Sequence, residues 1–349
     1  MMRRRTFLAQ AALAWQADGI DGAVRLLEDA QKRGEVAAAA LYARRGAWVK
    51  QHWCGLARSA DTVFLLASIT KPMTATGMEV LADRRELALA DPVHKYISEF
   101  RGGDRDLVTI RHLLTHTSGL PDMLPENEAL RRRHAPLSDF VAGACKVPLL
   151  FKPGTECRYQ SMGILLAAEI AARVTKTPFR EFLRREVFAP LGMTRTSLGL
   201  GGRKISETAP CQVTGNDDWN WNSPYWRDLG APWGGAHSSA PDVARFLEFF
   251  LHPDGRVLKR ETAAAMGVNQ NTGLNEPWGI GWMTTPGKLG KACSARAFGH
   301  WGSTGTICWA DPATDASFVL LTTKPAADSR ASLLAPVSDA VSEAFRPGR

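Results

Sequence analysis

Residues 63–71 read Val-Phe-Leu-Leu-Ala-Ser-Ile-Thr-Lys, and this stretch decides how the whole chain is interpreted. An apolar run ends at Ser68, and a helical spacing of apolar residues follows as far as Leu81. Because positions three apart share one face of a helix, the Ser68 hydroxyl and the Lys71 amine should be neighbours. A lysine can accept a proton from a serine nucleophile only if its environment lowers its ordinary pKa of about 10.4. The pattern therefore predicts a buried Lys71, whereas an exposed Ser and Lys at a helix start would carry no chemistry.

Two further motifs lie downstream of this stretch. Tyr159-Gln160-Ser161 follows the turn-forming residues 153–155 and precedes a strong helical pattern. Residues 299–305 read Gly-His-Trp-Gly-Ser-Thr-Gly and lie in a β-rich region near the other end of the chain. S-x-x-K alone is a common pattern, so the order and spacing of the three motifs carry the argument for a catalytic site.

Together the three motifs resemble the signatures S-x-x-K, Y-x-N and K-T-G of serine β-lactamases and penicillin-binding proteins. The sequence looks most like the branch that holds class C β-lactamases, D,D-carboxypeptidases, D-aminopeptidases and related esterases, and the resemblance covers roughly residues 21–346. Four more stretches support it: residues 113–120, 151–154, 190–193 and 234–239. The resemblance implies an α+β fold, with an antiparallel sheet flanked by helices and an inserted, mostly helical region.

The resemblance also implies roles for individual residues of this sequence. Ser68 would attack a carbonyl and form an acyl-enzyme, Lys71 would take or share its proton, and Tyr159 would act as general acid and later help to activate water. The backbone amides of Ser68 and Ser303 would bind the oxyanion. Such a reaction would need no metal and no cofactor.

Two departures from the lactamase pattern bear on the substrate. Ser161 stands where the family has Asn, so a hydroxyl replaces an amide that could hold a substrate carbonyl. His300 stands where Lys is usual, and because a histidine is mostly neutral at pH 7, a fixed cation for a substrate carboxylate is missing. In the family, a histidine here is common among esterases and aminopeptidases. Substrate contacts are expected from Ser161, Trp233, His300, Trp301 and Gly302.

These residues favour a serine hydrolase that acts on a small ester, either short-chain or aryl. A β-lactamase, D-amino-acid peptidase or amidase on the same scaffold is the first alternative, and a catalytically silent binding homologue is the second. No G-x-S-x-G elbow, Walker loop, G-x-G-x-x-G or H-E-x-x-H pattern occurs, which argues against the common rival hydrolase and nucleotide-binding classes.

Residues 216–233 are unusually rich in aromatic side chains. Two interpretations stay open: these residues form the wall of an apolar acyl or aryl pocket, or they pack as a loop over the core. The aromatic residues are Trp219, Trp221, Tyr225, Trp226 and Trp233.

The pattern of apolar residues predicts strands at both ends of the chain. Residues 36–42 and 48–53 predict a β-hairpin, and residues 278–283, 305–310 and 317–322 predict later strands. Helices are expected over residues 21–33, 240–251 and 331–345, with Ser239 capping the second of them. We expect a sheet domain from residues 18–70 and 231–349, a helical insert over residues 71–230, and the active site between them.

The composition, with 45% hydrophobic and 22% charged residues, is typical of a soluble globular chain. The formal charge of +8 comes largely from scattered arginines, so nucleic-acid binding is not expected. Charged residues interrupt every apolar stretch well before the roughly 20 residues that a bilayer requires, so stable membrane insertion is not expected either. Residues 1–17 include Arg-Arg-Thr-Phe-Leu, which leaves open a twin-arginine export signal, and thus a periplasmic or secreted protein, or a basic tail on a cytoplasmic one. Cys293 and Cys308 could pair, or remain free thiols. The sequence gives no basis for an oligomeric state.

Overall fold

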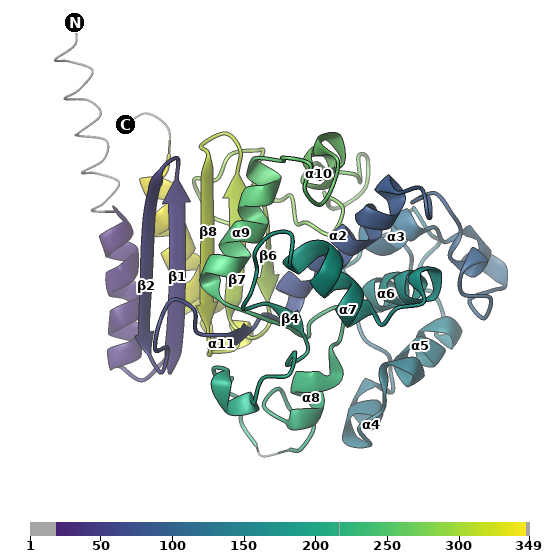
Figure 1. The fold of residues 1–349 in the computed structure, drawn as a ribbon, viewed down its shortest axis with the longest axis horizontal. Coiled ribbons are helices and arrows are strands. Elements are labelled where there is room, and N and C mark those ends of the chain that lie inside the picture. Colours follow the sequence, from purple (N-terminus) through teal and green to yellow (C-terminus); the bar gives the residue numbers. More distant parts are fainter. Residues whose placement is uncertain (1–18, 216, 347–349) are drawn as a thin grey trace, which may run out of the picture.

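A five-stranded antiparallel sheet joins the two ends of the described chain (Figure 1). The computed structural model describes residues 19–215 and 217–346. The strand order is β2-β1-β8-β7-β6, so the first hairpin pairs directly with a strand from the far end of the sequence. The strands are β1 (Ala38–Arg45), β2 (Trp48–Gly55), β6 (Phe298–Gly302), β7 (Thr306–Asp311) and β8 (Ala316–Thr322).

The sheet has a separate apolar core on each face, because side chains alternate along every strand. On one face, Leu41 and Leu320 pack beneath a helix over residues 19–32 and beneath α12 (Ala335–Ala344). On the other face, Ala40 and Leu321 pack with α9 (Ala240–Leu251) and with the core that continues into the helical region.

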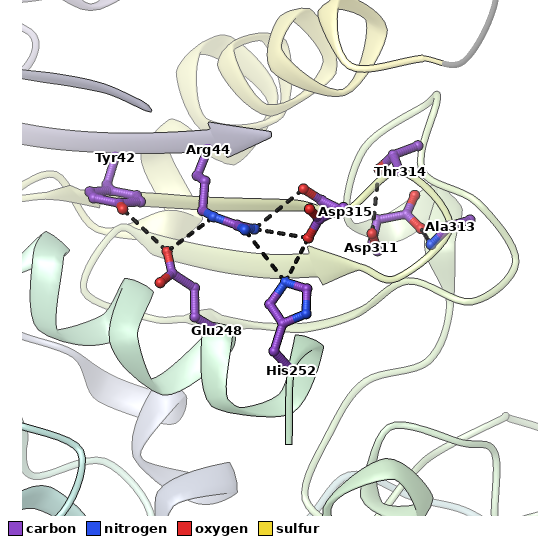
Figure 2. A network of polar contacts seen from close by, with 8 residues as sticks. All are labelled: Tyr42, Arg44, Glu248, His252, Asp311, Ala313, Thr314 and Asp315. Atoms are coloured by element: carbon purple, nitrogen blue, oxygen red, sulfur yellow. Dashed lines mark hydrogen bonds and ion pairs between the residues drawn. The ribbon is translucent and has the colours of Figure 1, made fainter. Parts of the chain in front are cut away.

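A polar network ties α9 to the sheet (Figure 2). The Tyr42 hydroxyl donates to Glu248 Oε1 at 3.2 Å, and the Arg44 guanidinium lies 3.0 Å from Asp315 Oδ1. His252 completes the network through a 2.8 Å contact with the same Asp315 oxygen. The network joins β1, the turn before β8 and the C-terminal end of α9.

The segment between the two halves of the sheet contains α2 (Thr70–Asp83), in which every residue from Thr70 to Leu81 is buried. Its main neighbour is α6 (Met162–Thr175). Strands β3 (Phe64–Leu65), β5 (Ala236–Ser238) and β4 (Ser197–Leu198) form a second, three-stranded sheet. The other helices are α3 (Ile110–Leu114), α4 (Asn127–Arg132), α5 (Leu137–Lys146), α7 (Phe179–Leu183), α8 (Pro224–Leu229), α10 (Arg260–Met266) and α11 (Ala326–Ser329).

The structure confirms the α+β class and the early hairpin, but one predicted strand is wrong. Residues 278–283 form only isolated bridges, Trp278 to Met283 and Met283 to Gly299. Gly281 has φ +75°, and the Gly279 amide donates to the Trp282 carbonyl, so the segment turns back on itself. The boundaries expected for the sheet domain and the insert stay a prediction.

The cap predicted for α9 is also wrong in its chemistry, although the helix begins at Ala240. The Ser239 side chain makes no capping bond. Asp242 lies in the first turn, where it accepts hydrogen bonds from the Arg195 amide and the Thr196 hydroxyl and pairs with Arg245. The first turn of α9 is thus tied to the loop before β4.

The six cysteines, including Cys293 and Cys308, are free thiols. None of the helices in the two described ranges is long and apolar enough to span a membrane. The predicted export signal or basic tail at residues 1–17 lies outside the described residues.

Candidate active site

Ser68 lies in a one-turn 3-10 helix, Ala67–Ile69, that leads from β3 directly into α2. Ala67, the residue before it, has φ +48°, a region that residues other than glycine seldom adopt and that costs of order 1–3 kcal/mol. Threonine hydroxyls bind three buried carbonyls of this turn. Thr304, Thr306 and Thr70 donate to the carbonyl oxygens of Leu65, Leu66 and Ala67. These bonds hold the turn in its strained form.

Lys71 is completely buried one helical turn after Ser68, as the sequence predicted. Its Nζ lies 3.1 Å from Ser68 Oγ and 3.0 Å from the backbone carbonyl oxygen of Trp233. Burial lowers the pKa of Lys71 to about 7, and the charge of Asp122 acts in the opposite direction. Near neutral pH, a large share of the molecules therefore carries an uncharged amine that can accept the proton of Ser68.

Tyr159 lies over the same amine, with its ring centre 4.6 Å from Lys71 Nζ. Burial raises the pKa of Tyr159 well above its ordinary value, and a hydrogen bond with Ser68 acts against that rise. The phenol is thus a proton donor at neutral pH. The neighbouring Gln160 fixes the position of the loop that carries Tyr159. Its backbone amide donates to His116 Nδ1, and its side-chain oxygen accepts from the Ser118 hydroxyl.

The end of β6 approaches the Ser68 turn closely because residue 302 is a glycine. A Cβ at Gly302 would lie 2.2 Å from the Leu66 carbonyl oxygen and 2.1 Å from Thr306 Oγ1. Ser303 follows at once, and its amide donates to no other residue within the described ranges. The backbone of β6 thus brings a free amide next to the nucleophile turn.

His300, on the same strand, is a neutral imidazole. Burial, followed by the charge of Lys71, lowers the pKa of His300 to about 3. Its Nδ1–H donates to the Trp301 carbonyl oxygen at 2.6 Å, so Nε2 is left as an acceptor.

A cavity of about 820 Å³ joins these groups. Six of the predicted site residues line it: Ser68, Tyr159, His300, Trp301, Gly302 and Ser303. Trp221, from the aromatic stretch, and Trp278 also line it. At the rim, Lys288 pairs with Glu276, and the Arg330 guanidinium lies 4.6 Å from the centre of the Trp301 ring.

Two of the residues expected to touch substrate do not line this cavity. Ser161 is buried and donates its hydroxyl to Asp122 Oδ1 at 2.6 Å. The Trp233 indole is buried against Phe140 and Trp226, and only its carbonyl reaches the site, through Lys71. Their contribution to the geometry is indirect.

Both interpretations of the aromatic loop hold in part. Trp221 lines the cavity, whereas Trp226 is buried in the core and the Tyr225 hydroxyl donates to the Ala135 carbonyl. Trp219 stacks on Arg131 instead. Sequence reasoning missed Asp122 and the cavity residue Trp278, because neither belongs to a motif and their positions depend on how distant loops meet.

The chain is similar in sequence to known proteins. The model of the Beta-lactamase family matches residues 23–341. Esterase EstB of Burkholderia gladioli is 35% identical over 209 residues, which are 53% of this chain and 52% of the esterase, so the match spans about half of that relative's length.

Solved structures share the fold over nearly the whole chain. One is EstCE1, described as a hydrolase with promiscuous acyltransferase activity, with a TM-score of 0.78, 19% identity, and coverage of 95% of this chain and 98% of that one. Another is a penicillin-binding protein homologue from Caulobacter crescentus, with a TM-score of 0.74, 23% identity, and coverage of 94% and 98%.

Proposed function

The chain belongs to the β-lactamase family of serine hydrolases, and from that premise we propose that it is an esterase that forms an acyl-enzyme at Ser68. The observation that carries the proposal is the completely buried amine of Lys71, 3.1 Å from the Ser68 hydroxyl. Burial makes this amine an effective base near neutral pH, which is what a serine nucleophile requires.

In the first half of the proposed reaction, the Ser68 oxygen attacks the ester carbonyl carbon while its proton passes to Lys71. The developing oxyanion is bound by the amides of Ser68 and Ser303, for which the unpartnered Ser303 amide and the close approach at Gly302 give support. Tyr159 then gives its proton to the leaving alcohol oxygen, the ester C–O bond breaks, and Tyr159 recovers a proton from Lys71.

In the second half, a water molecule attacks the acyl carbon. The same groups remove its proton and return one to Ser68 Oγ, so that the acid leaves and the serine is restored. Tyr159 is suited to this exchange because its phenol is protonated at neutral pH and lies over the Lys71 amine.

The character of the cavity supports ester substrates with an apolar or aryl group. His300 stays neutral, so the strand that lines the site offers no fixed cation for a carboxylate. We propose Trp221, Trp278 and Trp301 as the walls for the acyl or alcohol group. His300 and Gly302 would contact the atoms around the scissile bond, whereas Ser161 and Trp233 would act only indirectly.

A second candidate is a β-lactamase, D-amino-acid peptidase or amidase on the same scaffold. One observation favours it. Arg330 lies at the rim of the cavity and forms no ion pair within the two described ranges, so a carboxylate on a substrate could bind there.

Hydrolysis of p-nitrophenyl butyrate and of nitrocefin, with intact-mass detection of trapped adducts, tests the proposal. Wild type should hydrolyse the ester faster and gain one acyl mass, and Ser68→Ala should lose at least about 10³-fold in kcat/KM and carry no adduct. Ser98→Ala, which changes an exposed serine, is the matched control and should equal wild type.

Three results would contradict this function. Faster turnover of nitrocefin would favour the second candidate. An adduct that survives Ser68→Ala would exclude the mechanism. A wild type that neither turns over nor reacts with a fluorophosphonate probe would favour the catalytically silent homologue.

A further inference from the structure

Asp122 lies on the loop after α3 and is held by the third residue of the second motif. The Ser161 hydroxyl donates to Asp122 Oδ1 at 2.6 Å, and the Ser161 amide donates to the Asp122 carbonyl oxygen at 3.3 Å. Asp122 is exposed, yet within residues 19–215 and 217–346 it forms no ion pair with Lys, Arg or His. Ser161 thus fixes an uncompensated negative charge next to the catalytic groups.

Within the described ranges, Asp122 carries the one negative charge that acts on the pKa of Lys71. His116 and His300 are neutral, because burial lowers the pKa of each, and Tyr159 is protonated. The charge of Asp122 raises the pKa of Lys71 and of Tyr159 alike. The polar and titratable groups around this site include Ser68, His116, Asp122, Tyr159, His300 and the carbonyl of Trp233.

On the basis of the proposed function, we propose that Asp122, held by Ser161, is a positioning residue that stabilises the Lys71 ammonium formed during attack. When the proton moves from Ser68 Oγ to Lys71 Nζ, a positive charge appears in a completely buried place. An anion of fixed position offsets part of the cost of burying that charge. Ser161 therefore serves the reaction through Asp122 rather than by touching substrate.

The pH dependence of kcat/KM for p-nitrophenyl butyrate tests this, because the substrate does not titrate. The base is active when uncharged, so activity should rise with pH through a midpoint near the Lys71 pKa of about 7. Asp122→Asn removes the charge and keeps the shape. Its midpoint should move to lower pH by about half a unit or more, and its plateau should fall about tenfold, because the weaker base is a poorer proton acceptor.

Matched variants separate the charge effect from a structural one. Asp104→Asn, at an exposed site remote from the motifs, should overlay wild type, and Asp122→Glu should keep the midpoint near that of wild type. Ser161→Ala keeps the Asp122 carboxylate but removes the hydrogen bond that holds it. The midpoint of the pH profile of Ser161→Ala should therefore also move to lower pH, by less than that of Asp122→Asn. A lower plateau with an unmoved midpoint in Asp122→Asn would overturn the proposal.

The test remains decisive if Asp122→Asn fails to fold. Because Asp122 is exposed, 1 M salt should screen its effect and move the wild-type midpoint downward, and the Ser161→Ala midpoint should already be shifted. No shift in either measurement would reject the role of Asp122. Failure of the proposed function itself would give a different result, because hydrolysis of the ester would then persist in Ser68→Ala.

Discussion

At the scale of single residues, the close approach of β6 to the nucleophile turn depends on Gly302. Gly302→Ala would place a Cβ 2.2 Å from the Leu66 carbonyl oxygen, so one of the two backbones has to shift. Because both carry proposed oxyanion amides, we expect kcat/KM for p-nitrophenyl butyrate to fall by about 10²–10³. Overpacking of this kind also costs about 1–3 kcal/mol in the free energy of unfolding, measurable by urea titration.

Gly287→Ala is the matched control, because a Cβ there meets nothing within 4 Å. It should leave both activity and the free energy of unfolding close to wild type. Full activity in Gly302→Ala would contradict the placement of the oxyanion amides at this crossing.

The sequence predicts contacts most reliably between residues that are close to each other along the chain. Ser68 and Lys71 are three apart on one turn, so the helix itself brings them together, and the burial required by the chemistry was part of the prediction. Ser161 and Trp233 were expected at the substrate, but their surroundings come from distant segments. Asp122 contacts Ser161 across 39 positions of sequence, which no local pattern encodes.

At the scale of elements, α2 carries a buried acid that the catalytic site does not use. Burial raises the pKa of Glu79 to about 7, and the nearby Asp83 acts in the same direction. Since the pKa of Glu79 in the folded state exceeds its ordinary value, the contribution of Glu79 to the free energy of unfolding should be largest below about pH 4.5. It should then fall as pH rises toward 7, and level off above that pH.

Glu79→Gln removes this proton linkage. We expect the variant to gain on the order of 1–3 kcal/mol over wild type at pH 8 and less than about 1 kcal/mol at pH 5, as measured by urea unfolding at both values. Glu86→Gln, at an exposed position just beyond α2, is the control and should show no such pH-dependent difference. An equal effect of Glu79→Gln at both pH values would show that the side chain acts through packing instead.

Sequence patterns fixed most elements but not every contact within them. The limits of α9 follow from its apolar spacing, whereas the Ser239 hydroxyl makes no capping bond and the Asp242 side chain binds the adjoining loop. At residues 278–283, alternating apolar residues suggested a strand, but Gly279 and Gly281 permit a tight turn instead. The local spacing of apolar residues does not show which of these tertiary contacts will form.

At the scale of the whole molecule, the sheet binds the first and last parts of the described chain into one structure. The order of strands, helices and strands predicted a sheet made from both ends, and β1 does pair with β8. The register of that pairing, Leu41 opposite Leu320, depends on how the two cores pack and could not be obtained from the sequence.

Leu320 and Leu321 test whether the two cores unfold together. They are neighbours on β8, both fully buried, yet Leu320 belongs to the core under α12 and Leu321 to the core that extends toward α2. Leu320→Ala and Leu321→Ala should each cost about 2–5 kcal/mol through lost burial and the cavity left behind.

Strand β8 contributes buried side chains to both cores, so both cores lose packing when β8 leaves the sheet. We therefore expect both variants to lower the midpoint of a single calorimetric transition, with the calorimetric and van't Hoff enthalpies of unfolding in agreement. Two separated transitions, with Leu320→Ala moving one and Leu321→Ala the other, would show that the helical region folds independently of the sheet. In that case the Ser68 turn, which connects β3 of the small sheet to α2, would be the hinge between two independently folding parts.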